Sequence, residues 1–477
     1  IAFALCPMLT RGAIEAIELR GSEALQRTYL PKLVSGEWTG TMVLTEPQAG
    51  SDLAAVRTRA VPQGDGSYRL EGQKIFITYG EHDLAENILH LTLARTPTAP
   101  PGVKGISLFL VPKFLVNEDG SLGARNDVRC VSLEHKLGIH ASPTAVLALG
   151  DAGGAVGYLV GEENRGIEYM FIMMNAARYA VGLQGLGVSE RAWQQALWYA
   201  RERLQGTELG SKDRASVAIV RHPDVRRMLM LMKSQVEAMR AVASVVAAAM
   251  DRARCHPDAA ERASAQAFVD LMIPVVKGWS TETSGEVTSL GIQVHGGMGY
   301  VEETGAAQHF RDARITPIYE GTTGIQGADL IGRKVARDGG AAIGKVIADM
   351  RAVQAQAAAA GTPDLDAIAA NLAGGIDALE SATRFIVATY GKDVRRAAVG
   401  AVPFLMLFGT VAGGWQMARA ALAALRHVKA GNGDGFLRAK ITTARFYADQ
   451  VLVRAPGLAL TVTSGAEGAL AIEDEYL

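Results

Sequence analysis

Glu320 is a plausible candidate for proton transfer in this sequence. It lies in the string IYEGTTGIQ at Ile318–Gln326, after two apolar residues and before Gly321. A carboxylate between apolar neighbours and a glycine turn is partly desolvated, which raises its pKa toward the range of a general base. Taken alone, the string favours an exposed glutamate at the start of a helix over a general base. Thr322 and Thr323 could cap that helix or bind a cofactor.

The string TEPQAGSD at Thr45–Asp52 is suited to holding a flat or phosphorylated ligand. Its small residues Ala49, Gly50 and Ser51 allow the backbone to approach a ligand closely. Thr45 and Ser51 add hydroxyl groups, and the backbone adds N–H donors. An ordinary loop after a strand is an equally good interpretation of this string by itself.

Phe76 lies in the apolar run KIFIT at Lys74–Thr78, which predicts a strand. Its ring could pack on an aromatic ring system. An aromatic residue in a strand is more often part of the core, so both interpretations stay open.

The string QVHGGMGY at Gln293–Tyr300 predicts a tight passage of the backbone, because three of its residues are glycine. It is not GxGxxG and follows no predicted strand, so it does not indicate a Rossmann phosphate loop. His295 lies inside it, and a hydrogen-bonded structural role fits this histidine as well as a catalytic one.

The elements that must position these residues change in type along the chain. Residues 1–40 predict helices with short breaks that end near Pro31 and Gly36. Residues 41–157 contain short apolar runs separated by turn residues, which predict a small β-barrel or sandwich. The runs are Lys74–Thr78, Ile88–Ala94, Ile106–Val111 and Ala145–Leu149.

Two helical regions follow the β region. Residues 158–335 carry stripes such as Ile167, Met170, Phe171 and Met174, which predict a bundle that carries Glu320. We expect a glycine-rich interruption from Gly291 to Gly299. Residues 336–477 predict an additional C-terminal helical domain. The predicted fold class is therefore multidomain, with both α and β parts.

Composition excludes several classes of protein. The 477 residues include 48 Lys and Arg against 49 Asp and Glu, so no overall field attracts nucleic acid or an anionic membrane. The three cysteines are Cys6, Cys130 and Cys255, which are too far apart for a disulfide framework or a CxxC metal site. They indicate a reducing compartment, so we expect a cytoplasmic protein. The start at Ile1 suggests a sequence that begins inside a longer protein.

Taken together and in this order, the strings resemble the acyl-CoA dehydrogenase flavoprotein family. TEPQAGSD is followed by GQKIFIT at Gly72–Thr78, KLGIHAS at Lys136–Ser142, the helix with Arg178, QVHGGMGY and IYEGTTGIQ. The resemblance covers about residues 1–335, with only the last part of the family's N-terminal helical domain. The C-terminal extension, together with PPGVKGISLFLVPKFL at Pro100–Leu115, is similar to 3-methylmercaptopropionyl-CoA dehydrogenases and long-form bacterial fatty acyl-CoA dehydrogenases.

The resemblance implies α,β-dehydrogenation of an acyl-CoA thioester with FAD as cofactor. Glu320 falls on the catalytic base, which removes the α-proton while the β-hydrogen leaves as hydride to flavin N5. The product is a trans-2-enoyl-CoA. The thioester oxygen accepts hydrogen bonds from the backbone N–H of Glu320 and from a ribityl hydroxyl of FAD, and these stabilise the developing enolate.

The resemblance also assigns binding residues, and it implies no metal. The cofactor-binding positions are Met42, Leu44, Thr45, Gly50, Ser51, Phe76, Thr78, Arg203, Gln293, Gly297, Thr322 and Gly324. The substrate-binding positions are Ser51, Arg178 and Tyr319. Because a neighbouring subunit completes the FAD site in this family, a homo-oligomer is implied, either a dimer or a tetramer. An electron-transferring flavoprotein is the expected electron acceptor.

Three alternatives keep the fold and change the function. An acyl-CoA oxidase would pass electrons to oxygen. A DNA-binding relative would carry a basic C-terminal region, but Lys and Arg after Ala336 occur singly or in short pairs such as Arg395–Arg396. A non-catalytic scaffold is disfavoured by the intact Glu320 and TEPQAGSD.

A run of 22 uncharged residues, Ala397–Ala418, is long enough to span a bilayer. It contains Pro403 and several glycines, with Gly409 and Gly413 at the small-xxx-small spacing of membrane helices. Arg395, Arg396 and Arg419 bracket it in a domain that the resemblance makes soluble. We therefore expect a buried helix of the additional domain and no membrane span.

Overall fold

Residues 1–180 and residues 181–477 form two units in the computed structural model, which describes all 477 residues. This division is coarser than the four segments expected from the sequence. The N-terminal helices and the β region belong to the first unit, and the C-terminal helices join most of the bundle in the second. Helix α3, Gly166–Glu202, contributes residues to both units.

The first unit contains an eight-stranded mixed sheet, a two-stranded sheet and two helices that precede the sheets. Its elements before α3 are α1 (Leu5–Arg20), α2 (Glu23–Ser35), β1 (Trp38–Val43), β2 (Arg59–Pro62), β3 (Tyr68–Thr78), β4 (Asn87–Ala94), β5 (Ser107–Pro112), β6 (Phe114–Val116), β7 (Leu122–Arg125), β8 (Val128–Leu133), β9 (Thr144–Leu149) and β10 (Ala155–Leu159). The main sheet has the order β1-β4-β5-β10-β3-β9-β8, with β2 paired to β3, and β6 and β7 form the two-stranded sheet. Only β1 and β4 pair in parallel. The four predicted apolar runs lie in β3, β4, β5 and β9.

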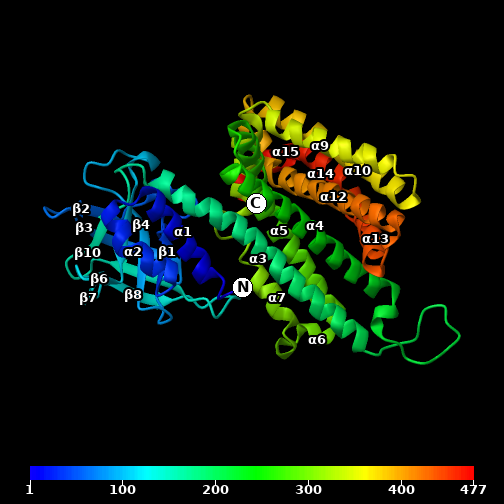
Figure 1. Cartoon of the computed structure of the whole chain (residues 1–477), viewed down its shortest axis with the longest axis horizontal. Helices are drawn as coiled ribbons and strands as arrows, with labels where there is room; N and C mark the ends of the chain where they lie inside the picture. The colour runs from blue at the N-terminus through cyan, green and yellow to red at the C-terminus, as the bar shows by residue number, and fades with distance from the viewer. The chain divides into compact units, whose positions relative to one another are not determined.

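Helices α1 and α2 lie against this sheet (Figure 1). Gly40 of β1 allows the close approach, because a Cβ there would lie 2.4 Å from the Cβ of Ala13 in α1. The backbone N–H of Gly40 donates to the hydroxyl of Thr10 at 3.1 Å. The expectation that Pro31 marks a helix end is wrong. Pro31 lies inside α2, which ends at Ser35 before Gly36 with φ +82°.

The second unit has only helices as its secondary-structure elements, apart from one isolated antiparallel bridge between Leu204 and Ala218. Besides its share of α3, it contains α4 (Pro223–Cys255), α5 (Ala259–His295), α6 (Gly297–Tyr300), α7 (Ala306–Ala313), α8 (Thr323–Asp329), α9 (Ala341–Ala358), α10 (Pro363–Tyr390), α11 (Val394–Val399), α12 (Ala401–His427), α13 (Gly435–Gln450), α14 (Ala455–Ser464) and α15 (Ala466–Ala471). A π-helical segment, Leu330–Ala336, continues α8. Helix α4 packs along α5, and α12 packs against α4, α5, α10 and α13 (Figure 1).

The uncharged run forms the end of α11 and the first two thirds of α12. The helical segment that includes α12 is the one segment long and apolar enough to cross a membrane, and 83% of its most apolar window is buried within the protein. Its glycines accept aromatic rings: a Cβ at Gly409 would lie 2.1 Å from Trp279 of α5, and a Cβ at Gly413 would lie 2.4 Å from the hydroxyl of Tyr447 in α13. The predicted buried helix is therefore confirmed, with its glycine face filled by neighbouring helices.

Candidate active site

The string TEPQAGSD forms a closed turn directly after β1. The backbone N–H of Glu46 donates to the carbonyl of Ala49 at 3.0 Å, and the N–H of Ala49 donates back to the carbonyl of Glu46 at 2.9 Å. Gly50 and Ser51 follow and are exposed. A side chain at Gly50 would meet no protein atom within 4 Å. The turn therefore presents small residues with open space beside them, as the predicted close approach of a ligand requires.

Glu46 anchors this turn through a buried ion pair with Lys74 of β3. The side chains are 3% and 0% exposed, and Nζ lies 2.8 Å from Oε1. The Glu46 carboxylate also accepts hydrogen bonds from the backbone N–H of Arg57 (2.8 Å) and from the hydroxyl of Thr58 (2.6 Å). Burial raises the pKa of Glu46, but the charge and hydrogen bond of Lys74, with those from Thr58 and Arg57, outweigh it and hold the pKa at about 2. Glu46 is therefore ionised at neutral pH.

Lys74 also fastens the turn to the sheet. Its Nζ donates to the carbonyls of Leu44 (3.0 Å) and Leu93 (2.8 Å) as well as to Glu46. An ammonium group has three protons, so each has an acceptor. Burial lowers the pKa of Lys74 to about 8, with the charge of Glu46 opposing the shift. The lysine thus remains mostly protonated at neutral pH.

Phe76, two residues after Lys74 in β3, has its side chain outside the core. The pairing of β3 with β9 shifts register between Lys74 and Ile77. Phe76 has φ +58°, in the left-handed region, and its side chain is 59% exposed. The core interpretation is therefore wrong for this residue. Its ring is free to stack on a planar ligand, and Thr78 lies half-buried two residues further along.

Glu320 lies in a left-handed turn of the second unit. Glu320 has φ +55° and Gly321 has φ +85°. The Nζ of Lys277 in α5 donates to the carbonyl of Gly321 at 2.6 Å. The Nε2 of Gln326 donates to the same carbonyl (3.3 Å) and to that of Glu320 (3.5 Å). Both donor side chains are 0% exposed, so the backbone from which Glu320 projects is held by buried groups. Glu320 itself is half-buried, which agrees with the partial desolvation expected of a general base.

Tyr319 and the two threonines complete this turn. The Tyr319 hydroxyl donates to the Oε1 of Gln184 in α3, and burial, with the nearby charge of Glu320, raises the pKa of Tyr319. The hydroxyl of Thr322 accepts from the N–H of Ile325 at 3.2 Å, so Thr322 caps α8. Thr323 instead donates its hydroxyl to Glu282 of α5 at 2.5 Å. The capping alternative is therefore realised at Thr322.

The expected glycine-rich interruption is wrong in its first half. Helix α5 continues through His295, and the chain leaves it only at Gly296, which has φ +60°. His295 is 5% exposed, its Nδ1 bonds the carbonyl of Gly291 (2.7 Å), and its ring stacks on Tyr199 at 4.4 Å. Burial lowers the pKa of His295. These contacts favour the structural role over the catalytic one.

The remaining predicted positions differ in exposure. Arg203, Gln293, Gly297 and Gly324 are exposed. Met42 is 7% exposed and packs in the core of the first unit, while Leu44 and Thr45 are half-buried.

Arg178 is 5% exposed in α3, with its guanidinium 5.8 Å from the ring of Phe171. A buried guanidinium of this kind can support a substrate site from within the protein, which is the kind of role predicted for it.

Three family models match this chain in sequence order. They are the acyl-CoA dehydrogenase middle domain at residues 41–152, the acyl-CoA dehydrogenase C-terminal domain at 164–336, and the acetyl-CoA dehydrogenase C-terminal-like domain at 343–473. The chain is also 53% identical over 453 residues to 3-methylmercaptopropionyl-CoA dehydrogenase from Ruegeria pomeroyi, covering 95% of this chain and 76% of that protein. The chain belongs to the acyl-CoA dehydrogenase family.

Solved structures extend the likeness across the whole fold. ACDH-11 from Caenorhabditis elegans, solved with C11-CoA, has a TM-score of 0.74 at 25% identity and covers 94% of this chain and 72% of its own. An acyl-CoA dehydrogenase from Bacillus anthracis, solved with FAD, has a TM-score of 0.75 at 22% identity, covering 98% and 76%, and shows the shared fold. The helices after α8 therefore belong to an architecture known in other acyl-CoA dehydrogenases.

Acyl-CoA dehydrogenases are FAD-dependent oxidoreductases, and residues of this chain fit that cofactor. In the first unit, the open space beside Gly50 and the exposed ring of Phe76 suit a planar ring system. In the second unit, the exposed Gln293 and Gly297 suit a polar ligand. FAD supplies a hydride acceptor when bound, and the chain supplies the residues that hold and orient it.

Lys74 and Lys277 have structural roles that no motif predicted. Lys277 lies among apolar residues in MIPVVKGW at Met272–Trp279, whereas Lys74 begins the apolar run KIFIT directly after Gln73. A lysine is almost never fully buried unless it is paired. A single lysine inside an apolar run is the signal that could have marked Lys277, and Lys74 at the edge of such a run gives a weaker signal.

Replacing Glu46 with Gln should destabilise the protein and loosen FAD. The change leaves the buried Lys74 without its counter-charge, which costs about 3–5 kcal/mol. The contribution of Glu46 is complete above its ordinary pKa of 4.5 and is lost as pH falls toward about 2. The stability difference between wild type and variant should therefore narrow in acid.

Denaturant unfolding at pH 7 and pH 3, with the ratio of flavin to protein absorbance, measures both effects. Glu71→Gln is the matched control, because Glu71 is an exposed residue of β3, the strand that carries Lys74. Equal stability of Glu46→Gln and wild type at pH 7 would contradict the anchoring role.

Replacing Lys277 with Met should slow turnover while FAD stays bound. The carbonyl of Gly321 would lose its 2.6 Å donor, and a shift of the Glu320 backbone by ~1 Å can cost up to about 100-fold in rate. We expect kcat to fall at least tenfold with a much smaller change in KM. Lys345→Met, at an exposed position of α9, is the control. An unchanged kcat in a flavin-loaded Lys277→Met enzyme would exclude the positioning role.

Proposed function

We propose that this protein is an acyl-CoA dehydrogenase that introduces the trans-2 double bond into a short acyl-CoA, with 3-methylmercaptopropionyl-CoA as its preferred substrate. The observation that carries the proposal is the Glu320 turn. A half-buried carboxylate lies on a backbone fixed by two buried donors, Lys277 and Gln326. Such an arrangement suits a base that must meet a weakly acidic C–H bond in one fixed geometry.

Glu320 acts as the base that takes the α-proton of the thioester onto its carboxylate. Because an isolated thioester α-proton is far less acidic than a carboxylic acid, the site must stabilise the negative charge that develops on the thioester oxygen. The backbone N–H of Glu320 serves this role in the proposal, and the left-handed turn sets its direction. FAD, when bound, supplies the acceptor for the β-hydride and a second hydrogen-bond donor to the same oxygen.

Tyr319 shapes the acyl end of the site. Its hydroxyl is committed to Gln184, so its ring presents an apolar wall and its hydroxyl is not left without a partner. Identity of 53% over almost the whole chain supports a short methylthio acyl group as the preferred substrate. Shorter fatty acyl-CoA thioesters are the next candidates, because a methylthio group and an ethyl group differ little in size.

We further propose a homo-oligomer that acts in the cytoplasm and passes electrons to an electron-transferring flavoprotein. Large apolar side chains are exposed near the end of α3, on α6 and on α7, which supports an interface there. They include Trp198 (61% exposed), Met298 (50%), Tyr300 (86%) and Phe310 (37%). The exposed Gln293 and Gly297 lie next to this surface in sequence, as expected if a second copy completes the cofactor site.

Steady-state rates across three thioesters test the substrate assignment. We expect kcat/KM to be highest for 3-methylmercaptopropionyl-CoA, lower for butyryl-CoA and lowest for palmitoyl-CoA. The highest value for palmitoyl-CoA would reject the short-chain assignment, and no turnover of any thioester would reject the dehydrogenase itself. Anaerobic reduction followed by air separates the oxidase alternative, since rapid reoxidation by oxygen alone would identify an oxidase.

Replacing Glu320 with Gln should abolish proton abstraction and leave FAD bound. An amide cannot accept the α-proton, and loss of a positioned general base lowers rates by about 10²- to 10⁴-fold. Stopped-flow reduction of the flavin by substrate measures the step directly. Glu303→Gln, at an exposed position of the same unit, should reduce flavin at the wild-type rate. Near-normal reduction in Glu320→Gln would assign the base to another residue.

A further inference from the structure

A cavity of about 540 Å³ lies in the second unit, where α4, α9 and α12 meet. Its walls come from two of the matched regions, because α4 lies in the bundle and α9 and α12 lie in the C-terminal extension. The volume is within the range of small-molecule sites, roughly 300–1,000 Å³. None of the proposed catalytic or FAD-binding residues lines it, so it is separate from the site described above.

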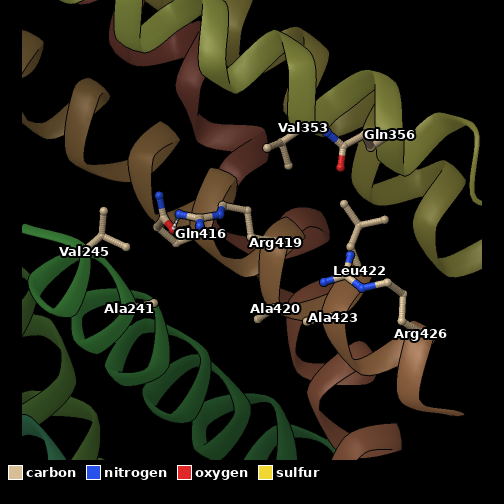
Figure 2. Close-up of a pocket in the computed structure, with 10 residues that line it drawn as sticks. All are labelled: Ala241, Val245, Val353, Gln356, Gln416, Arg419, Ala420, Leu422, Ala423 and Arg426. Atoms are coloured by element: carbon tan, nitrogen blue, oxygen red, sulfur yellow. Dashed lines mark hydrogen bonds between the residues drawn. The ribbon is translucent and has the colours of Figure 1, made fainter. Parts of the chain in front are cut away.

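Two arginines give this cavity a positive charge. Arg419 and Arg426 are seven residues apart on α12, so they lie on one face about two turns apart. Figure 2 shows both side chains extending from α12 into the space that α4 and α9 border. The lining contains no Asp or Glu, and neither arginine forms an ion pair. Two guanidinium groups without an acidic partner favour an anionic occupant.

Arg419 is already oriented by protein groups behind it. Its Nη1 donates to the Oε1 of Gln416 at 2.9 Å, and its guanidinium lies 5.8 Å from the ring of Trp415. Gln416 is 5% exposed and lines the cavity, and its Nε2 donates to no protein group. This Nε2 atom is not among the buried polar atoms that lack a partner, so it is accessible and can donate to an oxyanion in the cavity. Arg419 and Gln416 therefore present a preformed set of N–H donors.

The rest of the lining is mainly aliphatic. Ala241 and Val245 come from α4, Val353 comes from α9, and Leu422 and Ala423 come from α12. Gln356 of α9 adds a polar group. A site with donors for an oxyanion and aliphatic walls fits an amphiphile better than an inorganic ion.

We propose that this cavity binds a small amphiphilic anion, in which a carboxylate or phosphate is joined to a short hydrocarbon chain. The oxyanion contacts Arg419, Arg426 and the amide of Gln416, and the hydrocarbon contacts the aliphatic side chains of α4 and α9. Because the site joins the bundle to the C-terminal extension, its ligand stabilises both together by binding the folded state.

Isothermal titration calorimetry of the full-length, FAD-loaded chain tests the proposal with octanoate, octyl phosphate, inorganic phosphate and 1-octanol. We expect saturable binding of octanoate or octyl phosphate at one site per chain, and at least tenfold weaker binding of inorganic phosphate and of 1-octanol. The better of the two octyl ligands identifies the head group. Saturable binding of neither, or equal binding of 1-octanol, would overturn the proposal.

Variants locate the site. Arg419→Gln and Arg426→Gln should each weaken binding about tenfold or more. Ala423→Phe should block binding by filling the cavity while keeping both charges. Arg438→Gln is the matched control, at an exposed position of α13 outside the cavity. Unchanged affinity in all three cavity variants would place the ligand elsewhere and refute the assignment, whatever the protein's catalytic activity.

Discussion

Two completely buried lysines hold the backbone from which the site residues of this protein project. Lys74 in the first unit and Lys277 in the second are both 0% exposed. Lys74 donates to the carbonyl of Leu44, directly before the TEPQAGSD turn, and Lys277 donates to the carbonyl of Gly321, directly after the candidate base Glu320. A buried ammonium group is unfavourable unless its protons are all satisfied, so it tolerates few rearrangements of its acceptors. That intolerance is what makes these turns rigid.

The same arrangement explains how strained backbone survives at both places. Phe76 and Glu320 have left-handed φ values of +58° and +55°, a conformation that costs about 1–3 kcal/mol for a residue other than glycine. The cost is offset by the hydrogen bonds that surround each turn. At Phe76 this conformation leaves the side chain 59% exposed, and at Glu320 it leaves the side chain half-buried. The exposed Phe76 and the half-buried Glu320 thus lie next to backbone that the buried side chains of Lys74 and Lys277 hold by hydrogen bonds.

Much of this organisation follows from the sequence because local patterns record it. The apolar runs in β3, β4, β5 and β9 were visible as strands, and the order of the motifs identified the family and made Glu320 the candidate base. A strand before TEPQAGSD was expected, but its bounds and its complete burial were not, because Trp38–Val43 contains two threonines and a glycine. Helix α5 was cut short in the prediction, since Gly291 suggested a break that neighbouring helix packing removes.

The two buried lysines show more clearly what could not be predicted from the sequence. Nothing local distinguishes a lysine that reaches water from one that reaches a carbonyl 44 residues away, as Lys277 does at Gly321. The partner is fixed by the fold, and only the apolar surroundings of the lysine hint that a partner exists. Tertiary hydrogen bonds of this kind therefore lie beyond single-sequence patterns, although their donors can be suspected.

The glycine face of α12 bears on whether the C-terminal extension is a detachable module. Trp279 occupies the space above Gly409, and Leu405 fills the space beside Gly278, so α12 covers the residues that directly follow Lys277 in α5. Gly327 of α8, just beyond the Glu320 turn, lies equally close to the start of α12 at Ala401. A chain that ended after the bundle would expose the indole ring of Trp279 and the backbone at Gly278 and Gly327 to water, close to the Glu320 turn. The extension is thus an internal wall of the catalytic half rather than an appendage, and relatives that lack it must cover the same surface by other means.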